Sequence, residues 1–320
     1  MTVILYLLLL ILALLLGLFL WSRALASQAR ATVPPVGQIM EVAGGSIHYV
    51  EMGPADAPPI LLIHGIAAQL QHFTYGVTDL LRDDFRLIVI DRPGSGYARR
   101  DNDEDAALPA QAAMIAEFLD RKNVGSAVVA GHSLGGAVGL ALALDHPEKV
   151  RALALIAPLT HVQDEIPPIF KGLELRTHAM RRFVAHVFAQ PVGKLTTDKV
   201  LAFAFAPEHP PADFMTRAAA ILGLRPEAFI GAASDLVTLE ATLPAQVARY
   251  GELDLPGGVL YGDSDVLLDP PVQGRSMTAY GLTYDTLPGR GHMLPITAPA
   301  EVARFIRDVA ARAPGAPTKS

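Results

Sequence analysis

The stretch "VVAGHSLGGAVGLALAL", residues 128–144, places a single serine among glycines, between an apolar run and an alanine- and leucine-rich run. At its centre, residues 131–135 form the pattern Gly-x-Ser-x-Gly. A sharp turn from a strand into a helix strains the backbone of such a serine and exposes its hydroxyl. The pattern therefore predicts that Ser133 is a nucleophile. The alternative is a turn that binds phosphate at the helix N-terminus, but the lysine or G-x-G-x-x-G spacing typical of such turns is missing here.

A serine hydroxyl attacks only when a base removes its proton, so Ser133 requires a partner. His292 is the best candidate among the ten histidines, because "LPGRGHMLPITAP" (287–299) follows the last predicted strand and precedes the closing helix. That position is a loop at the carboxyl edge of the sheet, where the serine turn also lies. The base in turn needs a carboxylate that holds its tautomer. The preceding loop, "GVLYGDSDVLLDP", offers Asp263, Asp265 and Asp269.

The oxyanion that forms during attack by a serine needs two backbone N–H donors. One is expected from Leu134, directly after the serine. The other is expected from Ile66 in "LLIHGIAAQ" (61–69), at the tip of the first buried strand. The loop "DRPGSGYA" begins at Asp91, and its glycines permit a tight turn beneath the site.

Strand-like and helix-like runs alternate over residues 38–158 and 251–312. Short apolar runs such as "PPILLIHG" and "FRLIVIDRPG" are separated by helical ones such as "PAQAAMIAEFLDRKN". This alternation predicts an α/β fold, with a mostly parallel sheet covered by helices on both faces. Residues 159–250 break the rhythm with several helical runs and many prolines, which indicates a helical cap inserted into the α/β core. We expect a linker at 22–37 and a flexible tail at 313–320.

Residues 1–21 predict a transmembrane anchor. The run from Val3 to Leu20 carries no charge, and its eighteen residues would span about 27 Å as a helix, close to the hydrocarbon thickness of a bilayer. Trp21 follows at a position typical of an interfacial aromatic. We therefore expect residues 3–20 to contact membrane lipid.

A signal peptide cleaved after Ala26 is the alternative to a retained anchor, since Ala24-Leu25-Ala26 fits an A-x-A cleavage site. The apolar run is longer than is usual for a signal peptide, and no lysine or arginine precedes it. We therefore favour a single-pass anchor that is retained. Arg23 and Arg30 follow the span, and this charge bias favours a cytoplasmic catalytic domain.

The composition excludes several classes of protein. The formal net charge of the 320 residues is −6, and no basic run suggests a nucleic-acid partner. The chain has no cysteine, which excludes disulfides, thiolate metal sites and a cysteine nucleophile. We expect neither a cofactor nor a metal ion.

Residues 38–312 resemble the α/β-hydrolase family, in the branch of cofactor-free haloperoxidase-like esterases and C–C bond hydrolases. The pieces that carry the resemblance occur in the family's order: "HGIAAQ", "DRPGSGYA", "GHSLGG", "GDSD" and "GRGH". The resemblance implies a triad of Ser133, Asp265 and His292, with the acid three residues after Gly262, and it implies a helical cap. Serine at the elbow separates the chain from haloalkane dehalogenases and epoxide hydrolases, which use aspartate there.

Together these observations predict a membrane-anchored serine hydrolase that cleaves apolar carboxylic esters through an acyl-enzyme. C–C bond hydrolysis and acyl transfer by the same triad remain alternatives, as does a catalytically silent binding protein on this scaffold. The apolar runs of the cap, such as "VLAFAFAP" and "AFIGAASDLV", predict an apolar substrate. The competing interpretation is that these side chains form the cap's own small core.

Overall fold

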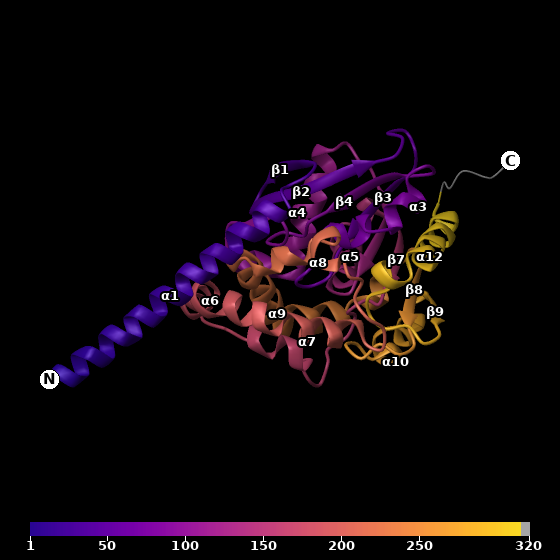
Figure 1. Ribbon diagram of the computed structural model, residues 1–320. Coiled ribbons are helices and arrows are strands. Elements are labelled where there is room, and N and C mark those ends of the chain that lie inside the picture. The colour runs from indigo at the N-terminus through magenta and orange to yellow at the C-terminus, as the bar shows by residue number, and fades with distance from the viewer. Residues whose placement is uncertain (315–320) are drawn as a thin grey trace.

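A computed structural model describes residues 1–314, so the part of the expected tail at 315–320 lies outside the described residues. A nine-stranded sheet forms the centre, in the order β1-β2-β4-β3-β6-β7-β8-β9, with β5 paired to β2 (Figure 1). The pairings from β4 to β9 are parallel, and those of β2 with β1, β4 and β5 are antiparallel. The strands are β1 (Gln38–Val42), β2 (Gly45–Met52), β3 (Pro59–Ile63), β4 (Arg86–Ile90), β5 (Arg99–Arg100), β6 (Ala127–His132), β7 (Val150–Ile156), β8 (Gly257–Gly262) and β9 (Thr283–Leu287). The predicted mostly parallel sheet is therefore confirmed.

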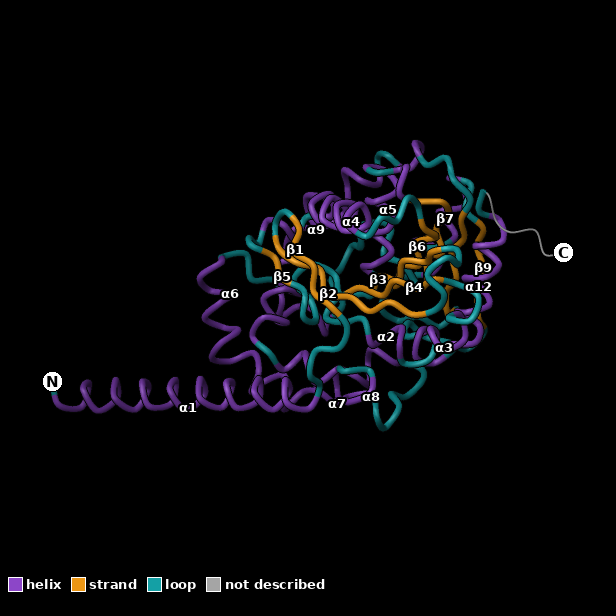
Figure 2. The backbone as a smooth tube through the Cα atoms, turned by 90° about the horizontal axis from the view of Figure 1, so that it is seen from above, coloured by secondary structure: helices purple, strands orange, loops and turns teal. Residues whose placement is uncertain are grey.

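Helices cover both faces of this sheet (Figure 2). Alternate residues of one strand supply the two cores, because successive side chains of a strand point to opposite faces. Leu61 and Ile63 of β3 pack in the core with α4 and α5, whereas Ile60 and Leu62 pack in the other core with α3 and α12. The helices outside the cap are α1 (Thr2–Thr32), α2 (Gln71–Thr74), α3 (Val77–Leu81), α4 (Leu108–Arg121), α5 (Leu134–Asp145), α10 (Pro270–Gln273), α11 (Leu294–Thr297) and α12 (Pro299–Arg312).

A helical segment separates β7 from β8, as the resemblance implied. We call its residues 159–250 the cap. It contains α6 (His178–Val184), α7 (Gln190–Phe205), α8 (Phe214–Arg217) and α9 (Pro226–Val247), with short 3-10 turns that include η3 (Pro168–Leu173) and η5 (Ala220–Leu224) and a π-helical turn, η4 (Ala185–Ala189). These helices lie on one side of the sheet, and α7, η4 and η5 contact α1 (Figure 1).

The prediction of a linker at 22–37 is wrong for residues 22–32, which continue α1 without a break. Ser22, Leu25, Ala26 and Ala29 are buried, and their spacing places them on one face of the helix. Ala29 packs against Ala219 and Leu222 near the cap turn η5. Burial of this face against the body is the physical reason why the helix continues past the apolar run.

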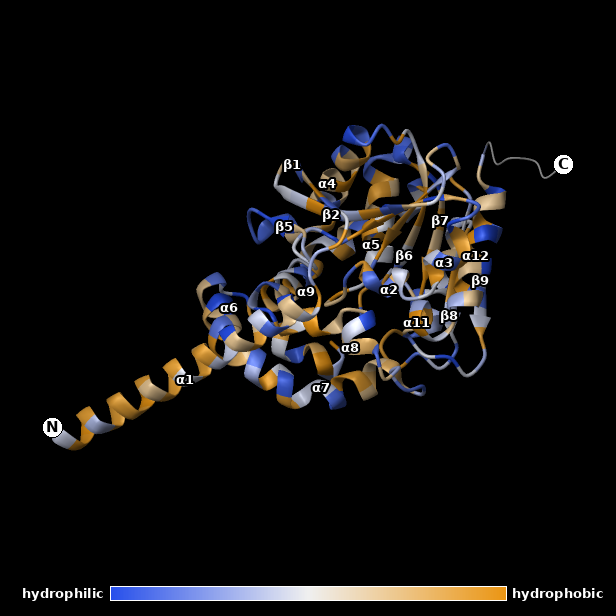
Figure 3. Cartoon of the chain, turned by 45° about the horizontal axis from the view of Figure 1, so that its top comes forward, coloured by the Kyte–Doolittle hydropathy of each residue, from blue (hydrophilic) through white to orange (hydrophobic). Residues whose placement is uncertain are grey.

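The N-terminal half of α1 projects away from the body, and its apolar side chains are exposed (Figure 3). By length and composition, α1 could cross a membrane. A half docked by one face and an exposed apolar half thus share one helix, so the docked half sets the orientation of the exposed half.

The docking of α1 can be tested at Ala29, which is fully buried. Ala29→Glu would place a charge in an apolar contact, which is costly, so we expect the docked half to separate from the cap. Limited proteolysis in detergent micelles should then cleave between residues 30 and 38 about tenfold faster, equivalent to about 1.4 kcal/mol of docking energy. Ala31→Glu is the matched control, because Ala31 is exposed. Equal cleavage of both variants would contradict the docking.

Candidate active site

Ser133 lies at a sharp turn between β6 and α5, with φ of 55° and ψ of −123°. This left-handed backbone region is unfavourable for a residue with a side chain. The turn is possible because glycines lie on both sides of Ser133. A Cβ added to Gly131 would lie 2.5 Å from the carbonyl oxygen of Gly135, and one added to Gly135 would lie 2.1 Å from that of Ile63. Only glycine fits at these two positions, so the strand and the helix can approach closely enough to form the predicted elbow.

His292 and Asp265 are brought together from two loops after β8 and β9. His292 Nδ1 lies 2.7 Å from Asp265 Oδ2, and both side chains are buried. The other carboxylate oxygen, Oδ1, accepts the backbone N–H groups of Leu267 (2.8 Å) and Leu268 (3.1 Å). Because a carboxylate can only accept, Nδ1 of His292 carries the proton and Nε2 is free to act as a base.

The other two aspartates of this loop are exposed at the surface. Asp263 is exposed, and its Oδ1 accepts the backbone N–H of Gly289 (2.8 Å) and the hydroxyl of Ser264 (2.9 Å). Asp269 is exposed at the start of α10. Asp263 thus connects the loop after β8 to the loop after β9. The geometry favours Asp265 as the partner of His292.

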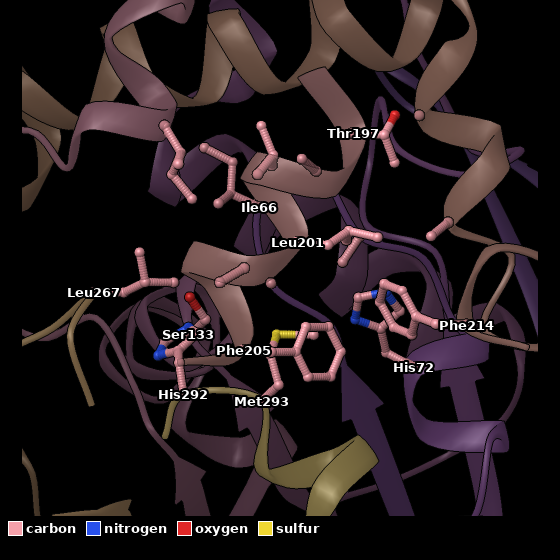
Figure 4. A pocket seen from close by; sticks show the side chains of 18 of the residues that line it. Ile66, His72, Ser133, Thr197, Leu201, Phe205, Phe214, Leu267, His292 and Met293 are labelled. Carbon is pink, nitrogen blue, oxygen red and sulfur yellow. The ribbon is translucent and has the colours of Figure 1, made fainter. Parts of the chain in front are cut away.

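The two expected oxyanion donors flank Ser133. Leu134 is the first residue of α5, so its N–H has no partner within that helix. Ile66 lies in the turn after β3, and this turn touches the serine directly, since a Cβ added to Gly65 would lie 2.9 Å from Ser133 Cβ. Ile66, Ser133 and His292 all line one cavity (Figure 4).

Two further histidines near the site are neutral. Burial and the proximity of His292 hold the pKa of His132 well below its usual range, and burial lowers the pKa of His72 to about 4. Neutral His132 donates from Nε2 to the backbone oxygen of His292, 3.1 Å away, and so helps to fix that loop. A neutral neighbour also does not oppose formation of an imidazolium at His292.

Two apolar cavities meet at Ser133 and His292. The larger, about 250 Å³, extends towards α7 and α8, where Leu201, Phe205 and Phe214 form its wall (Figure 4). The smaller, about 130 Å³, extends towards α9. Both are lined by Ile66, Ser133, Phe170, Leu267 and His292.

Several cap side chains of these walls belong to the apolar runs that the sequence singled out. Leu201 and Phe205 lie in "VLAFAFAP", and Leu236 lies in "AFIGAASDLV". Phe205 also packs with Phe214 in a small cluster next to the site. These cap side chains therefore both line the cavity and form a small local core.

Arg92 is the main site-proximal residue that the sequence did not indicate. Its guanidinium is fully buried and bonds the carbonyl oxygens of His64 and Gly65, both at 3.0 Å. It also pairs with Asp235 of α9 at 3.0 Å. These partners lie 27 to 143 residues away in the chain, so no local pattern could have revealed them.

A family model described as alpha/beta hydrolase fold matches residues 58–299. The chain belongs to the α/β-hydrolase family. The resemblance inferred from the motifs and the predicted fold class are both confirmed.

Individual relatives match shorter stretches. The magnesium-chelatase 30 kDa subunit of Rhodobacter capsulatus is 36% identical over 121 residues, which cover 38% of this chain and 42% of the relative. Lipase 1 of Psychrobacter immobilis is 30% identical over 138 residues, or 43% of each chain. The chain thus matches less than half the length of these curated relatives.

Among solved structures, that of a membrane phospholipase A described as a bacterial virulence factor is similar along nearly its whole length. The similarity covers 97% of this chain and 99% of the phospholipase, with 25% sequence identity and a TM-score of 0.67. The covered share is large enough to include part of α1 as well as the α/β core.

Proposed function

We propose that the chain is a membrane-anchored serine hydrolase that cleaves apolar carboxylic esters through an acyl-enzyme. The observation that carries the proposal is the position of Ser133 and His292 at the junction of two apolar cavities, with Asp265 bonded to Nδ1 of His292. An ester placed there would have its scissile carbonyl at Ser133 and one apolar group in each cavity. The lipase and the phospholipase among the similar proteins support lipid esters as the substrate class.

The chemistry follows from the roles of these groups. His292 Nε2 takes the proton of Ser133 Oγ while the oxygen attacks the carbonyl carbon. The N–H groups of Ile66 and Leu134 bind the oxyanion. His292 then protonates the leaving alcohol, and the acyl group remains on the serine. Water, deprotonated by His292, attacks this acyl-enzyme, and His292 then returns the proton to Ser133 Oγ as the acid is released. Throughout, Asp265 holds the tautomer and stabilises the imidazolium.

Docking of α1 supports retention of the anchor. Cleavage after Ala26 would separate Ser22, Leu25 and Ala26 from Ala29, although all four are buried on one face of the same helix. A retained α1 would keep residues 3–20 in the bilayer and hold the cap close to the lipid surface. Apolar esters concentrate at that surface, which fits the apolar cavities.

Ser133→Ala should abolish labelling by an alkyl fluorophosphonate and lower ester hydrolysis by about a thousandfold or more, because the nucleophile is lost. Labelling is followed by gel fluorescence on the full-length protein in micelles, and the labelled residue is identified by mass spectrometry. Ser264→Ala is the control, since Ser264 lies in another loop and its hydroxyl bonds only to Asp263 among the described residues. Labelling that persists in Ser133→Ala would contradict the assignment.

Asp265→Asn should lower kcat by about 10³- to 10⁴-fold, because an amide cannot hold the same tautomer of His292. Asp263→Asn should change kcat by less than about threefold, since Asp263 acts on the turn and not on the imidazole. Steady-state hydrolysis of a p-nitrophenyl ester measures both. The opposite ranking would transfer the role of the acid to Asp263.

A series of p-nitrophenyl esters tests the substrate class. Full-length enzyme in liposomes of ether-linked lipid should hydrolyse medium acyl chains faster than acetate, because the larger cavity can bury an apolar chain. Leu201→Trp should narrow that cavity and shift the preference to shorter chains, whereas Leu239→Trp, on the wall of the smaller cavity, should leave the acyl preference unchanged. A preference of the wild type for acetate or for charged acyl groups would contradict the proposal.

A further inference from the structure

Arg92 lies directly after β4 and Asp91, and no part of its side chain reaches solvent. Its Nε donates to the carbonyl oxygen of His64, and its Nη2 donates to that of Gly65, both at 3.0 Å. Nη1 donates to Gln111 Oε1 at 2.9 Å. A buried guanidinium is retained only where such partners satisfy its donors and balance its charge. Two of these partners belong to the turn that leads to Ile66.

His64 acts on the same turn. Its Nε2 accepts the backbone N–H of Arg92 at 2.9 Å. Burial and the charge of Arg92 hold the pKa of His64 well below its usual range, so the imidazole is neutral and carries one proton. That proton must be on Nδ1, which donates to the carbonyl oxygen of Gly65 at 2.8 Å. The Gly65 carbonyl therefore accepts two hydrogen bonds, one of them from a charged donor.

The Gly65 carbonyl and the Ile66 N–H belong to one planar peptide group, in which the two bonds point in opposite directions. Fixing the oxygen towards Arg92 therefore turns the N–H away from Arg92. The turn itself lies against the serine, since a Cβ added to Gly65 would lie 2.9 Å from Ser133 Cβ. A charged donor on the oxygen also polarises the peptide group and strengthens its N–H as a donor.

The charge of Arg92 is balanced from the cap. Asp235 of α9 is fully buried, and its Oδ2 accepts Nη2 of Arg92 at 3.0 Å. Its Oδ1 accepts Nη1 of Arg100 at 2.6 Å. Arg100 in turn donates to the backbone oxygen of Gly231 in the same helix at 2.9 Å. One ion-paired cluster thus connects a cap helix to the turn that carries Ile66.

We propose that Arg92 is a positioning residue that aims the N–H of Ile66 at the oxyanion, and that Asp235 makes this alignment depend on the seating of α9. The inference rests on the proposed serine hydrolase function. It adds to that function a role for two charged residues that do not touch the substrate, and a physical connection between the cap and the oxyanion site.

Arg92→Lys tests whether Arg92 positions the N–H of Ile66, because lysine keeps the charge but cannot reproduce the planar set of guanidinium donors. We expect kcat for a medium-chain p-nitrophenyl ester to fall about 10- to 100-fold, somewhat less than the loss of a whole oxyanion donor. KM should stay within about twofold, since the apolar cavities are unchanged. The rate of fluorophosphonate labelling should fall by the same factor as kcat. The acid limb of the pH profile should not move, because His292 and Asp265 are untouched.

Arg99→Lys is the matched control. Arg99 lies nearby in the chain, in β5, but it is exposed and pairs with Glu41 and Asp101, so its replacement should leave kcat and labelling unchanged. Asp235→Asn tests whether the alignment depends on the seating of α9. It also tests the role of Arg92 if Arg92→Lys does not fold. It retains the shape of the side chain and removes the charge, and we expect kcat to fall about 3- to 10-fold at constant KM.

The outcomes separate this inference from the function on which it rests. If the wild type is not labelled at Ser133, both are overturned. If the wild type is labelled while folded Arg92→Lys and Asp235→Asn keep kcat within about twofold, only the positioning role is overturned. A rise in KM with unchanged kcat would also overturn it, because it would show a loss of substrate binding and not of oxyanion binding.

Discussion

Strand β6 and helix α5 meet so closely at Gly131 that a side chain there would collide with the backbone of Gly135. This contact forces the left-handed backbone of Ser133 and leaves its side chain at the end of the strand. The start of α5 also lies directly against the end of β3, because a side chain at Gly135 would collide with the carbonyl oxygen of Ile63. The serine, the first N–H of α5 and the turn after β3 are therefore brought together by these two close contacts.

Most of the core could be predicted from the sequence because its signals are local. Each buried strand is a short continuous apolar run, as in residues 60–63 and 87–90, and the elbow is encoded within five residues. His292 could be selected by its place after the last strand. The choice among the aspartates required the resemblance, because Asp263 and Asp265 lie two residues apart and differ only in how their loop folds.

The remaining features depend on contacts that are distant in the sequence. The sequence predicts a linker from residue 22 onward because the apolar run stops at Leu20, yet the buried residues of 22–32 follow helical spacing, and small side chains fit the close contact with the cap. Arg92 has partners in three separate segments, one of them in the cap. Such a cluster becomes visible only when the fold brings these segments together.

Helix α1 and the larger cavity share one wall. The cap turn η5 and its neighbour Ala219 contact α1 through Leu222 and Ala29, and residues of the same turn, Ala220 and Leu224, line the cavity. Under the proposed function, the docked half of α1 would therefore position the acyl-binding wall relative to the bilayer. The helix would then be part of the substrate-binding architecture as well as a tether.

The central claim is that the elbow presents Ser133 to two backbone donors at the junction of the apolar cavities. A crystal structure of the full-length protein after reaction with an alkyl fluorophosphonate tests this claim most directly. The account predicts a phosphorus atom bonded to Ser133 Oγ, a phosphonyl oxygen within hydrogen-bonding distance of the N–H groups of Ile66 and Leu134, and an alkyl chain between α7 and α8. A phosphonyl oxygen that faces away from these two N–H groups, or a label on another residue, would contradict it.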